Sequence, residues 1–337
     1  MTVASAAAET PRTPSGRPDL SGTYDIKTLT PLERPEEQGD KLTITDEEAA
    51  SFRNQAAETL AQRNAASDPD RGAPPKGGDG SPGSKGNVGG YNAFWLDRGS
   101  GAFRIDGKWR TSIITLPKDG RKPPLTREAR DRAEARARLR GHVNTGTAWW
   151  IREGVDPGPY DDPEIRPLAE RCLLGFGSTG GPPMLPVSYN NLKRIVQTEE
   201  YVMILVEMVH DVRVIRMNDE HAPSDIRSWL GDSVGHWEGD TLVVDTINFN
   251  DSPALSGASR NLHVVERFSR IDADTLLYQF TVNDPTVWTG PWGGEYVWPA
   301  SENRVYEYAC HEANYSFGGI LRGARLLEAE ALGKAGR

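Results

Sequence analysis

Short β-prone runs separated by turn residues dominate the middle of the chain, between Ile195 and Asp284. Within this stretch, β-branched and aromatic residues alternate with turn signals at the spacing typical of hairpins. Gly239 with Asp240 forms one such turn signal, directly before a Thr-Leu pair that opens a new run. The pattern predicts five strands, over Tyr201–Val209, Val212–Met217, Thr241–Phe249, Leu262–Ile271 and Thr275–Asn283.

Consecutive strands joined by short loops usually become antiparallel neighbours in a sheet. The sequence has no repeated strand–helix–strand pattern, which would indicate a parallel sheet. We therefore expect a mainly β fold, in which a meander forms a curved antiparallel sheet or a lipocalin-like barrel. Helical decorations and long loops would complete a single globular domain.

The composition divides the chain into three segments. They are an extended N-terminal strap over residues 1–44, a helix with a flexible loop over 45–90, and a β-rich core over 91–337. Thr45 and Glu48 form a capping box, which predicts a helix over Asp46–Ala65. Gly and Pro crowd the stretch Ser67–Gly90, which predicts a flexible loop and leaves a lid function open.

Further elements flank the strand-rich stretch. Trp109–Leu116 has the composition of a strand, and the charged run Thr126–Arg140 predicts a solvated helix. We also expect a last strand over Arg304–His311, followed by a C-terminal helix or tail rich in Ala, Leu and Arg.

The charge balance limits the partners of the chain. With 39 Lys and Arg against 48 Asp and Glu, the formal net charge is −9. This balance argues against nonspecific nucleic-acid binding, which depends on basic residues set against phosphates. No apolar run approaches the ~20 residues that span a bilayer, so we expect a soluble protein without a membrane partner.

The N-terminus and the cysteines bear on location. The N-terminus lacks the basic and apolar regions of a signal peptide, which favours the cytoplasm; Ala4–Ala8 could be the remnant of a trimmed signal, which would place the protein in the periplasm. Cys172 and Cys310 are predicted to be two buried thiols, with a single disulfide as the alternative.

Three carboxylates fall in the apolar phase of predicted strands, where a side chain points into the core or a cavity: Glu207, Asp245 and Glu266. Burial raises the pKa of a carboxyl toward values useful for a general acid or base. Three such groups in one small sheet favour a polar cavity. The alternative is an internal ion pair with a nearby arginine: Arg213, Arg267 or Arg270.

Two histidines are candidate proton carriers. His210 and His311 each lie at the end of a predicted strand and precede a carboxylate, Asp211 or Glu312. A neighbouring carboxylate can orient an imidazole for proton transfer, although a structural role is the alternative for each ring. No HExxH or His-x-His spacing is present, so we expect no metal site.

Large aromatic residues gather in turn-rich segments rather than in strand interiors. Such rings often line the mouth of a site for a ring-shaped or lipophilic ligand, and the alternative is that they pack loops onto the barrel. The residues are Trp149, Trp150, Trp288, Trp292, Trp298 and Tyr315.

No motif indicates a cofactor or a covalent nucleophile. The glycine-rich GFGSTGG lacks the Lys and Ser or Thr of a P-loop, and no GxSxG elbow is present. Cys310 precedes His311, but adjacent strand residues point to opposite faces, so the two side chains should not act together. Because no cofactor-binding motif is present, we expect no cofactor.

Several segments together resemble a largely uncharacterised bacterial family of β-rich proteins that are often exported. The resemblance covers most of the chain apart from Ser67–Gly90. It implies a β-rich fold but no particular activity or catalytic residue. The segments are GRPDLSGTYD, YNAFWLDRG, RPLAERCLLGF, GPPMLPVSYNN, WEGDTLVVDTINF, ERFSRIDADTLLYQFTVNDP and YEYACHEANY.

These features predict a cofactor-independent acid–base enzyme, a lyase or isomerase, that acts on a small aromatic or lipophilic molecule in a barrel cavity. Arg213 or Arg267 would stabilise a developing oxyanion, and Trp288, Trp292 and Tyr315 would contact the substrate. Two alternatives remain: a lipocalin-like binding protein without chemistry, and a metal-assisted hydrolase. The acid–base groups would be Glu207, Asp245 and Glu266, with His210 or His311 as partner.

Overall fold

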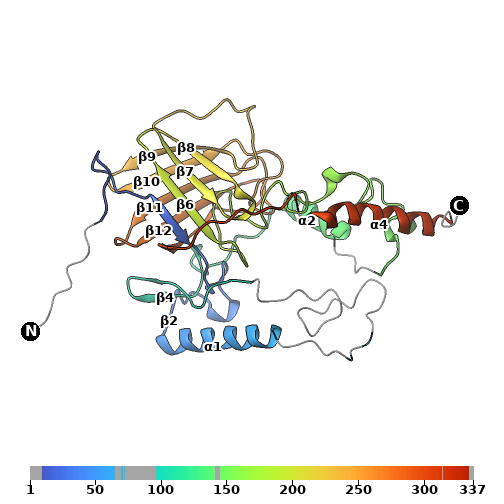
Figure 1. Cartoon of the computed structure of the whole chain (residues 1–337), viewed down its shortest axis with the longest axis horizontal. Helices are drawn as coiled ribbons and strands as arrows, with labels where there is room; N and C mark the ends of the chain where they lie inside the picture. Colours follow the sequence, from blue (N-terminus) through green and yellow to red (C-terminus); the bar gives the residue numbers. More distant parts are fainter. Residues whose placement is uncertain are drawn as a thin grey trace, which may run out of the picture. The chain divides into compact units, whose positions relative to one another are not determined.

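A computed structural model of the chain describes residues 10–64, 70, 72, 96–140, 145–312 and 314–333. It comprises two compact units (Figure 1). The predicted loop Ser67–Gly90 lies almost entirely outside the described residues, as does Ala4–Ala8. Unit 1 comprises Met1–Asn54, Asp97–Arg130 and Phe176–Tyr308, and unit 2 comprises Gln55–Leu96, Asp131–Gly175 and Ala309–Arg337.

Unit 1 contains a curled half-barrel of ten strands, which confirms the prediction of a mainly β fold with a curved antiparallel sheet (Figure 1). The strand order is β1-β6-β7-β8-β9-β10-β11-β12-β13-β5, and all neighbours are antiparallel except β8 and β9. The strands are β1 (Gly22–Asp25), β5 (Ile114–Leu116), β6 (Leu192–Gln197), β7 (Tyr201–Val206), β8 (Val212–Met217), β9 (Asp232–Glu238), β10 (Thr241–Ile247), β11 (His263–Arg270), β12 (Thr275–Asn283) and β13 (Trp292–Pro299).

A single bridge joins two distant strands of this order. Tyr24 of β1 pairs with Ala300, directly after β13, and the Ser301 amide donates to the Thr23 carbonyl at 2.8 Å. The half-barrel therefore bends far enough for its first strand to meet the end of its ninth.

All five strands predicted from the middle of the sequence are present, and β8 and β12 have the predicted bounds. The sequence missed β13, because Gly293 and Gly294 resemble a turn. Both glycines permit close strand pairing: a Cβ at Gly293 would meet the Phe280 carbonyl, and one at Gly294 would meet the Ile113 carbonyl.

Two other strand predictions are wrong. Trp109–Leu116 divides into β4 and β5, which belong to different sheets. Arg304–His311 forms no regular structure and pairs with none of the described strands. The sequence also missed β9, whose residues DSVGHWE lack a continuous apolar face.

A small three-stranded sheet and several helices complete the described structure. Thr45 caps the first helix: the Glu48 amide donates to Thr45 Oγ1 at 3.2 Å, and the Thr45 amide donates to Glu48 Oε2 at 2.8 Å, as the capping box predicted. The elements are β2 (Thr43–Ile44), β3 (Arg104–Ile105), β4 (Lys108–Arg110), α1 (Asp46–Arg63), α2 (Arg127–Arg140), α3 (Trp149–Arg152), α4 (Tyr315–Ala331) and the short 3-10 turns Glu36–Gln38, Pro163–Ile165 and Met208–His210.

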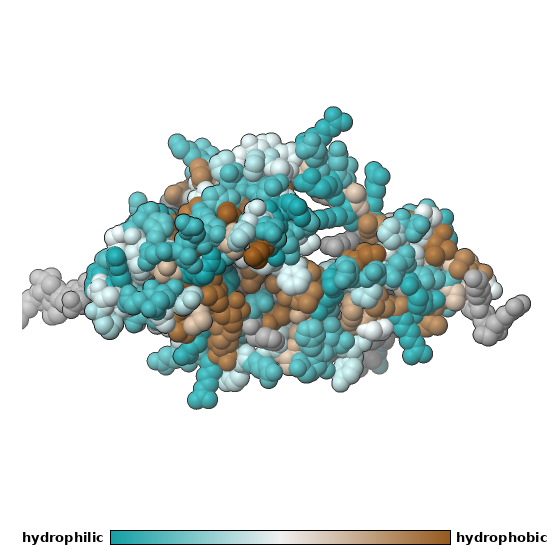
Figure 2. Space-filling model, turned by 90° about the horizontal axis from the view of Figure 1, so that it is seen from above, coloured by the Kyte–Doolittle hydropathy of each residue, from teal (hydrophilic) through white to brown (hydrophobic). Residues whose placement is uncertain are grey.

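The concave side of the half-barrel is a packed aromatic and aliphatic core. Alternate residues of each strand point inward, as the period of a strand requires. Tyr278 lies at the centre. The centroid of its ring is 4.9 Å from that of Trp298 and 5.0 Å from that of Phe268. In the view of Figure 2, hydrophilic residues cover much of the surface, and hydrophobic residues gather in patches between them.

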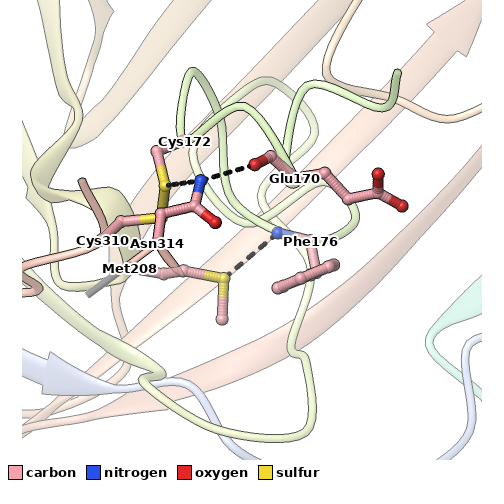
Figure 3. The surroundings of a disulfide bond; sticks show 6 residues. All are labelled: Glu170, Cys172, Phe176, Met208, Cys310 and Asn314. Atoms are coloured by element: carbon pink, nitrogen blue, oxygen red, sulfur yellow. Dashed lines mark hydrogen bonds between the residues drawn. A yellow bond between two sulfur atoms is a disulfide. The ribbon is translucent and has the colours of Figure 1, made fainter. Parts of the chain in front are cut away.

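Unit 2 is held together by an aromatic cluster and a disulfide. The Trp150 indole packs on the Tyr160 ring, with the ring centroids 4.8 Å apart. Its Nε1 donates to Glu328 Oε1 of α4 at 2.8 Å. Cys172 and Cys310 are bonded, so the prediction of two free thiols is wrong (Figure 3). The sequence could not show that segments 138 residues apart lie side by side.

No helix among the described residues is long and apolar enough to cross a bilayer.

Asn314, which precedes α4, donates to the Glu170 carbonyl at 2.8 Å and lies 3.4 Å from Cys172 Sγ (Figure 3). The start of α4 is therefore fixed to the segment around the disulfide by both covalent and hydrogen bonds.

The disulfide should contribute strongly to stability, because it closes a loop of 138 residues in the unfolded chain. We expect the double variant Cys172→Ser/Cys310→Ser to lose about 2–5 kcal/mol of unfolding free energy, measured by urea denaturation. Iodoacetamide should label neither cysteine of the native protein without reductant. An unchanged urea midpoint together with ready labelling would contradict this account.

Candidate functional site

An irregular segment fills one part of the half-barrel interior. Its residues Ser178–Leu185, sequence STGGPPML, are all buried, and we call this segment the plug. The backbone N–H and C=O groups of a buried loop need hydrogen-bond partners within the protein. The plug does so partly by itself, since the Leu185 amide donates to the Ser178 carbonyl at 2.8 Å and Ser178 Oγ donates to the Pro183 carbonyl at 2.6 Å.

Two interior tyrosines bind the plug backbone at Met184. The Met184 amide donates to the Tyr278 hydroxyl at 2.9 Å, and the Tyr296 hydroxyl donates to the Met184 carbonyl at 2.8 Å. Burial raises the pKa of both phenols well above the usual value, so both remain neutral donors. The side chains of β12 and β13 therefore bind the plug through its backbone.

A buried lysine lies beneath the plug. Lys193 of β6 is fully buried, and its Nζ donates to Thr179 Oγ1 at 3.0 Å. The next plug residue, Gly180, covers Asp211: a Cβ built on this glycine would lie 3.2 Å from Asp211 Oδ2. Two adjacent plug residues thus cover an amine and a carboxylate of the half-barrel.

Burial controls the charge of this amine. It lowers the pKa of Lys193 from 10.5 to about 7, against the attraction of Glu207, Asp25 and Asp211, which favours the charged form. An amine with this pKa is present in both protonation states near neutral pH and can therefore accept or donate a proton.

Glu207 is buried beside this lysine, but for a reason other than strand alternation. The strand β7 ends at Val206, and Glu207 directly precedes the 3-10 turn Met208–His210. Its Oε2 accepts a hydrogen bond from the Leu192 amide at 3.2 Å. Within the turn, Val209 has φ 61° and ψ 12°, a left-handed conformation that is costly for a β-branched residue. We call Lys193, Thr179, Glu207 and Asp211 the lysine cluster.

Glu266 is buried, as its strand phase predicted, and it forms the internal ion pair offered as the alternative. Arg213 binds it with two nitrogens, at 3.0 Å and 2.7 Å, and both side chains are almost fully buried. The Tyr278 hydroxyl donates to Glu266 Oε1 at 2.7 Å. Arg213 also donates to Ser233 Oγ at 3.1 Å, so Glu266 is held in a closed polar network.

The prediction that Asp245 points into the core is wrong. Leu242, Val244 and Thr246 occupy the inner face of β10, and Asp245 lies on the outer face with its side chain 37% exposed. There it bridges two imidazoles: His263 Nε2 lies 2.6 Å from Oδ2, and His221 Nε2 lies 2.9 Å from Oδ1.

The Asp245 bridge continues to a second carboxylate. His221 Nδ1 lies 2.9 Å from Asp232 Oδ2, and Arg216 pairs with the same carboxylate at 2.6 Å. The hydrogen bond to Asp245 raises the pKa of His263, and the Arg216 pair helps lower the pKa of Asp232 to about 2 despite partial burial. Through His221, these contacts link the segment between β8 and β9 to the outer face of the sheet.

The remaining candidates are not brought together. Arg267 points outward and binds Glu238 at 2.7 Å, whereas Trp288 and Trp292 are buried in the aromatic core. The expectation that these two rings, with Trp298, lie at an open mouth is therefore wrong, because β13 carries Trp292 and Trp298 inward. Tyr315 begins α4 in unit 2 and is 87% exposed.

The two candidate histidines belong to different units. His210 ends the 3-10 turn Met208–His210 in unit 1, and His311 lies in an exposed turn of unit 2. The part of the chain that the structure describes has no group of three or more His, Cys, Asp or Glu side chains placed to hold a metal ion.

Sequence reasoning missed Lys193 and the plug. The run Leu192–Gln197 has the composition of a strand, and Lys193 shares the inward phase of Ile195, so the alternation rule used for the carboxylates also applies to it. The burial of the glycine-rich GFGSTGG, in contrast, has no local signal. Comparison with models of protein families and with curated proteins found no match to the chain.

Removing one partner of the Arg213–Glu266 pair should be costly, because it leaves a buried charge. We expect Arg213→Met to lose about 3–5 kcal/mol of unfolding free energy, and Arg213→Met/Glu266→Gln to recover most of the loss. Urea denaturation gives both values. Arg267→Met, which breaks an exposed pair, is the control and should change stability by less than about 1 kcal/mol. Equal losses in all three variants would contradict a buried pair.

The lowered pKa of Lys193 makes stability depend on pH. Between pH 7 and 10.5 the unfolded lysine binds a proton that the folded lysine has lost, so the unfolding free energy rises with pH. Lys193 alone should contribute a rise of at most about 1.4 kcal/mol per pH unit. The difference between the wild type and Lys193→Met, measured by urea denaturation from pH 7 to 9.5, isolates this contribution from that of the tyrosines. A difference that stays constant with pH would show that Lys193 remains charged.

Proposed function

We propose that this protein is a cofactor-independent acid–base enzyme, a lyase or isomerase, that moves a proton on a small aromatic or lipophilic molecule. The acid–base groups are those of the lysine cluster, rather than Asp245 and Glu266. Lys193 exchanges the proton, and Glu207 and Asp211 are the carboxylates beside it. One observation carries the proposal: a fully buried amine lies among carboxylates and has a pKa near 7.

The surroundings of the cluster support this role. A buried, low-dielectric environment strengthens electrostatic interactions with a reacting group. The Glu207 carboxylate is oriented by the Leu192 amide, and the strained Val209 lies between Glu207 and Asp211 in the chain. Backbone strain of this kind is concentrated at functional sites.

Substrate must displace part of the plug to reach Lys193. The plug is bound by few hydrogen bonds to side chains, and its close packing depends on glycine. A Cβ at Gly181 would collide with Ala254 and lie 3.2 Å from Leu230 Cδ2. We therefore expect Gly181→Ala to loosen the plug, whereas Gly290→Ala adds a methyl group in open space and serves as its control.

Proton abstraction can be tested without the natural substrate. The probe is 1-nitro-2-phenylethane, an aromatic carbon acid without a carbonyl group, and proton NMR in D2O follows loss of the signal next to the nitro group. We expect the protein to accelerate this exchange, Gly181→Ala to accelerate it further, and Lys193→Met to slow it by about 100-fold or more.

The control for the lysine is Lys108→Met, since Lys108 is exposed on β4 and should not affect exchange. Exchange that is no faster than in buffer, in both the wild type and Gly181→Ala, would overturn the proposal. Equal rates in Lys193→Met and Lys108→Met would remove Lys193 from the mechanism.

The second candidate is a small-molecule binding protein without chemistry, favoured by the pairing of Glu266. Every oxygen of that carboxylate has a donor, so a structural role accounts for it. This candidate predicts that Gly181→Ala alters the affinity for 1-nitro-2-phenylethane, measured by calorimetry, while no variant changes proton exchange.

The disulfide supports an exported protein, with the periplasm as the proposed compartment. Thiols are kept reduced in the cytoplasm, whereas disulfides persist in oxidising compartments. The Cys172–Cys310 bond therefore favours the second of the two locations considered from the sequence.

A further inference from the structure

We propose that Lys193 is a nucleophile that forms an imine with the carbonyl carbon of a small ketone or aldehyde. This inference rests on the proposed acid–base function and names its substrate class. The geometry carries it: the amine is fully buried in the half-barrel and its hydrogen-bond acceptor is a plug hydroxyl. The charges of Glu207, Asp25 and Asp211 act on this amine.

The hydrogen bond of Lys193 distinguishes it from a structural lysine. Buried lysines are normally held by a carboxylate, as Arg213 is held by Glu266. Lys193 instead donates to Thr179 Oγ1, in a segment that substrate must move. Displacement of the plug removes this acceptor and exposes the nitrogen at the same moment.

The surrounding charge suits the product of the reaction. A neutral amine adds no charge to the interior, whereas a protonated imine is a cation. The carboxylates of Glu207, Asp25 and Asp211 stabilise a positive charge at the position of Nζ. Their attraction therefore increases as the imine forms, which is the differential stabilisation that catalysis requires.

The step balances without a cofactor. The neutral nitrogen adds to the carbonyl carbon, a C–N bond forms, and the π electrons move to oxygen. One proton passes from nitrogen to oxygen to give a carbinolamine. The ammonium form of Lys193 passes a proton to the carboxylate of Glu207 or Asp211 as it becomes the neutral nucleophile. That carboxyl group returns the proton to the carbinolamine hydroxyl, water leaves, and a protonated imine remains beside the carboxylate. That carboxylate can then remove a proton from the carbon next to the imine.

The test is reductive trapping on the oxidised full chain. The protein is incubated at pH 7 with 4-phenyl-2-butanone and cyanoborohydride, which reduces a protonated imine to a stable amine. Peptide mass spectrometry then locates a gain equal to the ketone less one oxygen atom. We expect labelling of Lys193 at least about tenfold faster than that of Lys108, because an exposed lysine is almost entirely protonated at this pH.

Two variants, each with a matched control, separate the possible outcomes. Gly181→Ala should increase labelling at Lys193 while Gly290→Ala does not, and Lys193→Met should lose the fast label while Lys108→Met retains it. Labelling of Lys193 that is no faster than that of Lys108, in both the wild type and Gly181→Ala, would overturn the inference. If the nitro probe still exchanges its proton in that case, the acid–base function stands without an imine; if it does not, both fall.

Discussion

The hydroxyl of Tyr278 is the point on which the interior of the half-barrel depends. It accepts the Met184 amide of the plug at 2.9 Å and donates to Glu266 at 2.7 Å, which in turn binds Arg213. One side chain thus joins the irregular segment to the buried ion pair. Because a buried polar group without a partner is costly, plug, phenol and ion pair support one another. Within this interior, burial lowers the pKa of Lys193 to about 7.

Strand alternation predicted much of the sheet and placed one carboxylate correctly. Around Glu266, buried and half-buried residues alternate without interruption, so its inward phase was readable. On β10 the rule failed, because Val243 and Val244 are both buried and the apolar run fits either phase. Asp245 lies on the outer face of β10 instead. Its partners His221 and His263 are distant from it in sequence, so no local pattern indicated that the three side chains meet. The side chain of Glu207 is buried by the 3-10 turn that ends β7, which alternation cannot describe.

The candidate site was harder to predict than the sheet. Lys193 follows strand alternation, as Glu266 does, and was accessible to the same reasoning. The plug was not, because the sequence of Ser178–Leu185 has the glycine and proline content of a surface loop. Its burial arises from side chains about 100 residues away in sequence, such as Tyr296, which bonds Met184 across a separation of 112 residues. Local composition cannot encode such a contact.

Amide hydrogen exchange can show whether the plug is enclosed in the half-barrel. If the half-barrel encloses Ser178–Leu185, the amides of Met184 and Leu185 should exchange as slowly in the native protein as those of β12, since both are buried and hydrogen-bonded. The exposed hairpin turn at Asp272 provides the fast reference within the same unit. Slow exchange at both plug amides, resolved by NMR, is the predicted result. Exchange as fast as at the Asp272 turn would contradict a closed interior and with it the environment assigned to Lys193.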